Sequence, residues 1–369
     1  MHAQNRQHHK QQQGIALIVA LIVTMLAVTV ATTVLYRQQI HIRLSGNIAH
    51  LEQAYLYAQG MEGFAGEILE ASFKDHEKYD SLKDDWAIEG IVFPILGGVM
   101  SGQMYDLQGR INLNSLARPI PPKLNLKNPD GSLKNPAPIQ KPDLAGITRN
   151  RLQNLIIEID PDESMGAPID FARIVKDWID DDTINGNTKP DPDPGTGSGA
   201  ESPFYQSMEP AYFSANTLLV NPTELRLLKN MNKDIYNKLI NPDPKKSLVA
   251  TLPIKDISNK PIKTPININT ANKEVLQSIG FDPATTEDII AERDIAPFEA
   301  LTGNTVLDTA LQSLDASSGP DARNDLDVKS SYFLLRGTVE INNARLTINS
   351  ILYRKNGKVS VIMRDFSNP

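Results

Sequence analysis

The feature that most constrains this chain is an uncharged apolar segment that begins directly after a short polar leader. Residues 1–14 carry Arg6 and Lys10 but no acid, and the 21 residues Ile15–Leu35 carry no charge. A helix of that length is about 31 Å long, enough to cross a hydrocarbon core of roughly 30 Å. A secretory signal has a shorter apolar core and a small-residue cleavage site after it, and neither follows here. We therefore expect any cut to precede the apolar segment, which stays as a membrane anchor.

Charge and residue usage limit the chemistry of the chain. Its formal net charge is −7, and loss of the two leader cations makes this −9. Such an acidic chain lacks the basic surface of a nucleic-acid binder. The absence of cysteine excludes thiol chemistry and disulfides, and the absence of histidine beyond His76 excludes a histidine triad or histidine metal ligands in all later residues. The leader cations favour a cytoplasmic N-terminus, although Arg37 and Arg43 reduce the contrast across the span, and this orientation makes the remaining chain periplasmic.

The helical pattern continues beyond the membrane segment. Apolar residues recur mostly at spacings of three and four from Ile40 to Ile68, which predicts one long helix, half in lipid and half packed on a domain. Gly60, Gly63 and Gly66 follow at intervals of three, and glycine weakens an isolated helix. We therefore expect this stripe of bare backbone to lie close to a partner surface.

Period-two patterns predict strands on both sides of a long interval. The patterns are Ala87–Phe93, Gly98–Leu107 and Gly109–Leu116, followed much later by Tyr332–Ile341, Arg345–Arg354 and Lys358–Asp365. The pairs Asn342-Asn343 and Asn356-Gly357 predict the turns of a C-terminal meander, because these residues tolerate positive φ. Three strands and one helix make an adequate layer only if the earlier strands join them.

The interval between these strands combines a proline-rich connector with helical signals. The helices expected there are Arg151–Glu158, Ile169–Ile179, Pro222–Leu228, Ala271–Ile279 and Ala284–Arg293. The sequence therefore predicts an α+β fold in which a long N-terminal helix packs on an antiparallel sheet and a large α-helical domain is inserted between strands.

The N-terminal junction resembles that of type IV pilins and pseudopilins. In that class a prepilin peptidase cuts after the glycine and methylates the new terminus, which here are Gly14 and Ile15. Aliphatic residues fill the positions after the cut, whereas Gln13 stands where a basic residue is common.

Six further segments, in order behind that junction, make the whole chain similar to the K-type minor pseudopilins of the type II secretion system. They are DLQGRINLNSL (106–116), DWIDDD (177–182), GAESPFY (199–205), PTELRLLKNM (222–231), TPININTANKEVL (264–276) and SYFLLRGTVEI (331–341). The resemblance implies a leader (1–14), a membrane helix (15–36), a stalk helix with first strands (37–116), an inserted helical domain (117–328) and a C-terminal meander (329–369). It also implies the inner membrane of a Gram-negative bacterium, the I- and J-type minor pseudopilins and the major pseudopilin as partners, and no nucleic acid.

Val19 adds an argument about position in a filament. Most pilin-like proteins have glutamate at the fifth residue after the cut, where the N-terminal amine of the subunit ahead relieves the cost of a carboxylate in lipid. A subunit with none ahead has no such amine, so Val19 suits a filament tip, although valine also simply fits a membrane helix. An insertion of this size, with a radius of gyration of roughly 16 Å, would also obstruct the packing of a filament shaft.

An acidic segment is the candidate metal site. Its members include Asp177, Asp180, Asp181, Asp182 and Glu201. Oxygen ligands without histidine or cysteine suit Ca²⁺, although the spacing is not that of an EF-hand, and a solvated surface loop is the alternative. The resemblance implies structural calcium in this insertion, and the matched positions assign it to these five residues.

The sequence allows three functions. The first is a non-enzymatic minor pseudopilin at the tip of the pseudopilus, supporting its assembly and protein export. The second is a membrane-anchored DNA-uptake protein, because residues 267–301 resemble a helix-hairpin-helix unit. There Asp282 replaces the second hairpin glycine and acids replace lysines, which would repel phosphate. The third is a periplasmic calcium-dependent hydrolase, for which no nucleophile and base pair stands out.

Overall fold

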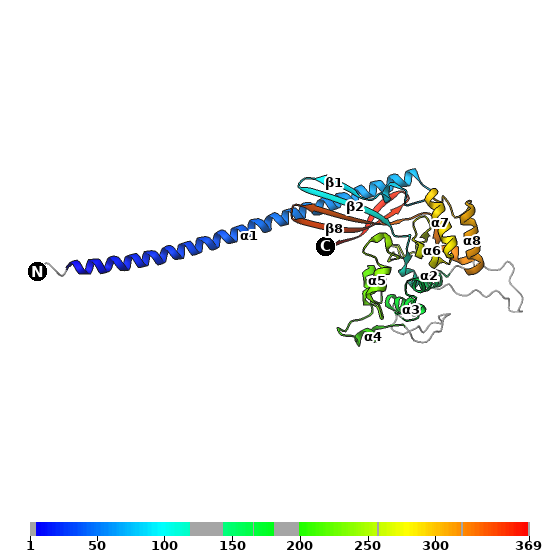
Figure 1. Cartoon of the computed structure of the whole chain (residues 1–369), viewed down its shortest axis with the longest axis horizontal. Helices are drawn as coiled ribbons and strands as arrows, with labels where there is room; N and C mark the ends of the chain where they lie inside the picture. The colour runs from blue at the N-terminus through cyan, green and yellow to red at the C-terminus, as the bar shows by residue number, and fades with distance from the viewer. Residues whose placement is uncertain are drawn as a thin grey trace.

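The computed structural model describes residues 5–118, 143–164, 166–180, 199–256, 258–318 and 320–367. Helix α1 (Asn5–Asp75) projects from the folded body at its N-terminal end and packs along the sheet at its C-terminal end (Figure 1). The residues that it buries against the sheet share one face at spacings of three and four, as a helix requires. They are Ala54, Ala58, Met61, Ala65 and Leu69. The prediction of one long helix is confirmed.

An antiparallel sheet of five strands, counted over the described residues, lies beneath this helix in the order β1-β2-β7-β8-β9. The strands are β1 (Ile91–Ile95), β2 (Gly98–Asp106), β7 (Tyr332–Ile341), β8 (Ala344–Lys355) and β9 (Lys358–Ser367). Strands β2 and β7, which are far apart in sequence, pair from Gly98 opposite Ile341 to Asp106 opposite Phe333. The sheet therefore joins strands from before and after the helical part, as the α+β prediction requires.

Two of the predicted strands are wrong in extent. The first begins at Ile91 rather than Ala87, because Asp85–Ala87 forms a 3-10 helix that buries Trp86, and Gly90 turns the chain at φ 72°. The alternating pattern of Gly109–Leu116 yields only the two-residue strand β3 (Ile111–Asn112) before a 3-10 helix at Leu113–Ala117. There the Asn112 side chain accepts a hydrogen bond from the amide of Asn114 at 3.2 Å, which starts the helical turn.

The part of the chain between β2 and β7 is mainly helical and lies beside one end of the sheet (Figure 1). Its helices are α2 (Leu144–Ile159), α3 (Pro168–Ile179), α4 (Ser202–Gln206), α5 (Lys233–Leu239), α6 (Lys273–Ile279), α7 (Pro283–Ile295) and α8 (Thr305–Ser318). Short parallel pairs join β3 to β4 (Val249–Ala250) and β5 (Ile266–Asn267) to β6 (Leu326–Asp327). The helix expected at Pro222–Leu228 is instead a 3-10 helix at Pro222–Leu227. Most of the proline-rich connector, residues 119–142, lies outside the described residues.

A buried ion pair fastens the end of the stalk to the sheet. Arg354 of β8 donates to both carboxylate oxygens of Asp80 at 2.5 Å and to the carbonyl of Leu69 in α1 at 3.2 Å. Both charged side chains are almost fully buried. Because an isolated charge is costly in such surroundings, each side chain depends on the other.

Replacing Arg354 with methionine is expected to lower the free energy of unfolding by about 3–5 kcal/mol, because Asp80 then remains buried without its cation. Lys358→Met is the matched control on the next strand. It removes a solvent-exposed pair with Glu70 at 3.1 Å and should lower stability far less than Arg354→Met does. Urea unfolding of the chain in detergent measures both. Equal losses would show that Arg354 contributes no more than a surface pair.

Candidate functional site

The candidate processing site lies inside the long helix. The backbone is helical from Asn5 onward, so Gly14 and Ile15 are consecutive residues of α1. The helix that follows Ile15 is long and apolar enough to cross a membrane, and the side chains of its apolar part are unburied. Val19 is one of these exposed side chains. The structure thus places the predicted junction within α1, directly before the part of the helix that is long and apolar enough for a single membrane anchor.

The glycine stripe divides between two environments. A Cβ added to Gly60 or Gly63 would meet no atom of the described residues within 4 Å, whereas one at Gly66 would lie 3.6 Å from Val359 of β9. Gly66 therefore packs on the chain's own sheet and faces no open surface. Gly60 and Gly63 leave bare helix backbone open on the outer side of α1.

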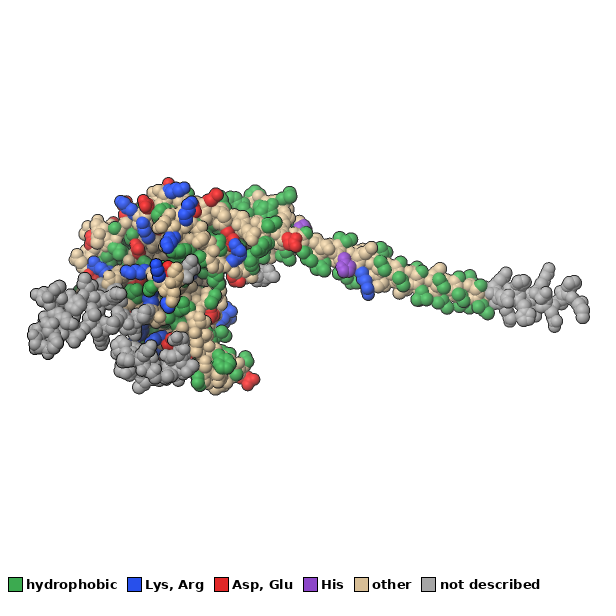
Figure 2. Space-filling view, turned by 180° about the vertical axis from the view of Figure 1, so that it is seen from behind, with side chains coloured by type: hydrophobic (Ala, Val, Ile, Leu, Met, Phe, Trp, Pro, Cys, Tyr) green, Lys and Arg blue, Asp and Glu red, His purple; other side chains and the backbone are tan. Residues whose placement is uncertain are grey.

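Exposed apolar residues continue along α1 between the membrane segment and the sheet. Figure 2 shows hydrophobic side chains along the projecting helix with few charges among them. Those outside the span include Ile40, Ile42, Leu44, Ile48, Leu51 and Leu56. A row of exposed apolar residues on one soluble element is typical of a surface that another protein or a membrane covers.

Two carboxylates of the predicted metal site are buried near the hydroxyl of Tyr205. Asp177 in α3 is 5 % exposed and Glu201, directly before α4, is 1 % exposed. A Cβ at Gly199 would overlap the Asp177 carboxylate, so the chain returns close to α3 just before Glu201. Burial raises the pKa of the Tyr205 hydroxyl, and the nearby Tyr212, Asp177 and Glu201 raise it further. The fold therefore brings these two acids, which are distant in sequence, into one buried region.

The remaining predicted ligands are only partly visible. Asp180 ends α3, whereas Asp181 and Asp182 lie outside the described residues. Within the described ranges there is no group of three or more histidine, cysteine, aspartate or glutamate side chains able to hold a metal. Buried hard oxygens at Asp177 and Glu201 fit the donor chemistry of Ca²⁺, but two carboxylates fall short of its usual six to eight oxygens.

The helix-hairpin-helix segment is unsuited to phosphate. Helices α6 and α7 are joined at Gly280, whose φ of 119° requires glycine. At the start of α7, the Asp282 carboxylate accepts from the amides of Ala284 and Thr285 at 3.0 and 3.1 Å. These are the donors that a phosphate would need. The adjacent Lys273 is paired with Glu287 at 2.9 Å. An acid thus occupies the helix N-terminus.

Two acids by which α1 holds the last strand were not predicted from the sequence. Glu62 is buried and pairs with Arg364 of β9, while Glu70 accepts from the amide of Val359 at 3.1 Å. The available signal was a glutamate within the buried helical face, beside Met61. Such a charge in an apolar stripe predicts a buried partner.

The fold and these surfaces define a class: a membrane-anchored, pilin-like subunit with a helical insertion in its sheet. A family described as "Type II secretion system (T2SS), protein K" matches residues 109–241. The protein of that name from Pseudomonas aeruginosa is 30 % identical over 362 residues, covering 96 % of this chain and 92 % of its own. The one from Aeromonas hydrophila is 28 % identical over 363 residues, covering 96 % and 97 %.

A solved structure has the same fold. It is the GspK-GspI-GspJ complex of the type 2 secretion system from enterotoxigenic Escherichia coli, which aligns with a TM-score of 0.62 at 22 % identity over 86 % of this chain and 97 % of that one. This chain belongs to the type II secretion system protein K family. The resemblance inferred from the sequence is confirmed, and the DNA-uptake alternative is not supported.

Proposed function

We propose that this chain is the minor pseudopilin at the tip of the type II secretion pseudopilus, where it supports filament assembly and protein export. Its role is non-enzymatic. The observation that carries the proposal is the long helix, whose apolar face extends beyond the membrane segment without cover from the described residues (Figure 2). Helices of neighbouring subunits would cover this face once the filament forms.

The partners follow from the relatives and from the surface. The related complex contains GspK, GspI and GspJ, and we assign I- and J-type minor pseudopilins to the exposed face of α1 around Gly60 and Gly63. The major pseudopilin lies below them. A prepilin peptidase in the inner membrane would cut between Gly14 and Ile15 and methylate Ile15. The body would then lie in the periplasm of a Gram-negative cell, as the leader cations favour.

The tip position rests on two features of this chain. Val19 offers no carboxylate to a subunit ahead of it, and burying an unpaired carboxylate in lipid would be costly. The helical part between β2 and β7 adds bulk beside the sheet (Figure 1). A body of this width fits the end of a filament better than its closely packed shaft.

We also assign a structural Ca²⁺ to the acidic region. Asp177 and Glu201 would supply buried oxygens, and Asp180, Asp181 and Asp182 would supply others. The ion would neutralise acids that otherwise repel one another, and so hold α3 and α4 together. This assignment is supported by the burial of both carboxylates beside Tyr205.

Gly63→Leu tests the assembly surface. The new side chain meets nothing within the described residues, and leucine favours helix over glycine, so stability should stay constant or rise slightly. Binding to the I- and J-type partners should weaken about tenfold or more, because overpacking a close contact costs roughly 1–3 kcal/mol.

Gly63→Ala is the control at the same position, because its single methyl group adds little bulk and should weaken binding much less. Co-purification and titration with the two partners measure binding, and thermal unfolding measures stability. Unchanged binding of Gly63→Leu would remove this face of α1 from the interface.

A further inference from the structure

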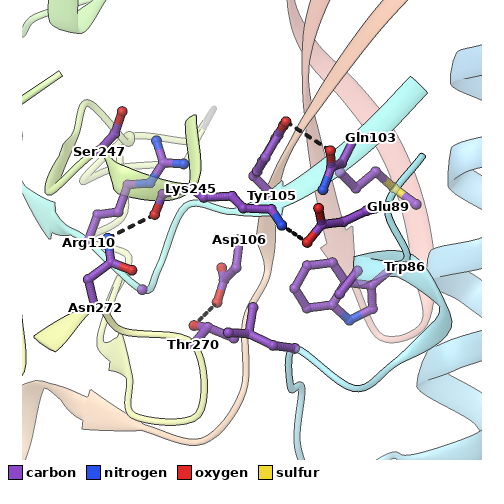
Figure 3. Close-up of a pocket in the computed structure, with 14 residues that line it drawn as sticks. Trp86, Glu89, Gln103, Tyr105, Asp106, Arg110, Lys245, Ser247, Thr270 and Asn272 are labelled. Atoms are coloured by element: carbon purple, nitrogen blue, oxygen red, sulfur yellow. Dashed lines mark hydrogen bonds and ion pairs between the residues drawn. The ribbon is translucent and has the colours of Figure 1, made fainter. Parts of the chain in front are cut away.

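A pocket of about 260 Å³ lies where the sheet meets the helical part, away from both the stalk surface and the acidic region. Figure 3 shows Arg110 on one side and Trp86 on the other, with Lys245 extending between them to Glu89. Trp86 and Met104 line the pocket but are almost fully buried, at 1 % and 6 % exposed. Its accessible apolar lining is Leu82, which is exposed, and Ala87, which is half-buried. A pocket that combines apolar lining with a few convergent polar groups has the usual composition of a ligand site.

Arg110 is the unusual member of this lining. Its side chain is 8 % exposed, yet among the described residues it makes one hydrogen bond, from Nη2 to the carbonyl of Pro244 at 2.8 Å. Burial lowers the pKa of Arg110 to about 10, so it stays charged at neutral pH. A buried guanidinium has five donors in a planar fork that matches a carboxylate. Most of these donors remain for a ligand.

The acids of the pocket are engaged elsewhere. The Asp106 carboxylate accepts from Ser330 Oγ at 2.6 Å, from Thr270 Oγ1 at 2.5 Å and from the amide of Gln108 at 2.8 Å. A fourth, longer bond comes from Asn267. None of these donors is Arg110. Asp106 therefore interacts with Arg110 only through longer-range electrostatics and occupies none of its hydrogen-bond donors.

Glu89 pairs with Lys245 across the mouth of the pocket. Both side chains are partly exposed, at 62 % and 40 %, so this ion pair is worth little and can exchange partners. Lys245 is held in place through its carbonyl, which accepts from the Asn272 side chain at 2.9 Å. A second cation is thus available beside Arg110 once Glu89 is displaced.

We propose that this pocket binds the C-terminal carboxylate of an extended peptide segment from another protein. The carboxylate lies between Arg110 and Lys245, displacing Glu89, and the neighbouring apolar side chain packs on Leu82 and Ala87. Arginine forks bind carboxylates through paired, charge-assisted hydrogen bonds. Capture of a C-terminal carboxylate is an established mode of peptide recognition.

The test uses the full chain in detergent and calorimetric titration with acetyl-alanyl-leucine. The same dipeptide with an amidated terminus and acetate are the comparison probes. The free acid should bind at least tenfold more tightly than the amide or acetate. Equal binding of acid and amide, or no binding of the acid, would overturn the proposal. Binding of acetate as tight as that of the peptide would overturn the peptide assignment.

Variants locate the binding. Arg110→Gln should weaken binding of the acid at least tenfold, and Lys245→Gln at least threefold. Glu89→Gln should tighten it, because the lysine loses its competitor. Lys246→Gln is the matched control, since Lys246 is the next residue but does not line the pocket. If Arg110→Gln fails to fold, the two rim variants decide the question. Weaker binding in Glu89→Gln, or equal effects at positions 245 and 246, would contradict the site.

Discussion

Replacing Gly14 with valine is expected to leave the chain at full length, inserted in the membrane and unable to join a filament. The proposed peptidase accepts a small residue before the cut. A branched side chain at position 14 would keep the scissile bond out of the peptidase active site. Processing should fall to an undetectable level and secretion should fail with it. Membrane insertion should persist, because the apolar segment after Ile15 is unchanged.

Mass spectrometry of the purified protein measures this directly. The wild-type chain should begin at Ile15 with one added methyl group, and Gly14→Val should retain all fourteen leader residues. Gln13→Ala is the matched control, since it changes the neighbouring residue without adding bulk at the cut and should be processed. A wild-type protein that begins at Met1 would rule out processing at this junction.

Removal of calcium is expected to lower the melting temperature of the chain. A ligand that binds only the folded state at about 100 times its Kd adds about 2.7 kcal/mol, which corresponds to roughly 3–4 °C in a protein of this size. Magnesium should help less, because it demands a tighter octahedral geometry. Scanning calorimetry in calcium, magnesium and chelator measures the three states.

Two variants assign the effect to the acidic region. Glu201→Gln and Asp177→Asn should each abolish most of the calcium-dependent shift, because each removes the charge of a buried oxygen ligand. Asp243→Asn changes an exposed acid that caps a short 3-10 helix elsewhere and should preserve the shift. If chelator does not change the melting temperature and elemental analysis finds no calcium, these residues form a solvated surface loop and no calcium site.

The C-terminal sheet was the most predictable part of the fold. Strand β7 has the predicted bounds, and the neighbouring strands differ by a residue or two. The reason is local: Asn342, Asn356 and Gly357 adopt the positive φ that their turns require. Elsewhere local signals were ambiguous. The cap at Asn221 and the following proline start either an α-helix or a 3-10 helix, and here the turn is 3-10.

The candidate sites were harder to predict from the sequence, because they depend on contacts between segments that are far apart in the chain. The spacing of Gly60, Gly63 and Gly66 could not reveal that Val359 covers only the last of them. The meeting of Asp177 with the segment before Glu201 depends on how α3 and α4 pack, which no local pattern encodes. The Arg110 pocket was missed for the same reason, because its walls come from segments far apart in the sequence.

The central claim is that this subunit occupies one end of the filament, and its position in assembled pseudopili tests that claim most directly. Filaments would be assembled with this chain carrying an epitope in its helical part, labelled with gold-conjugated antibody and imaged by electron microscopy. The account predicts one label at a single end of each filament. Label spaced regularly along the shaft would contradict it.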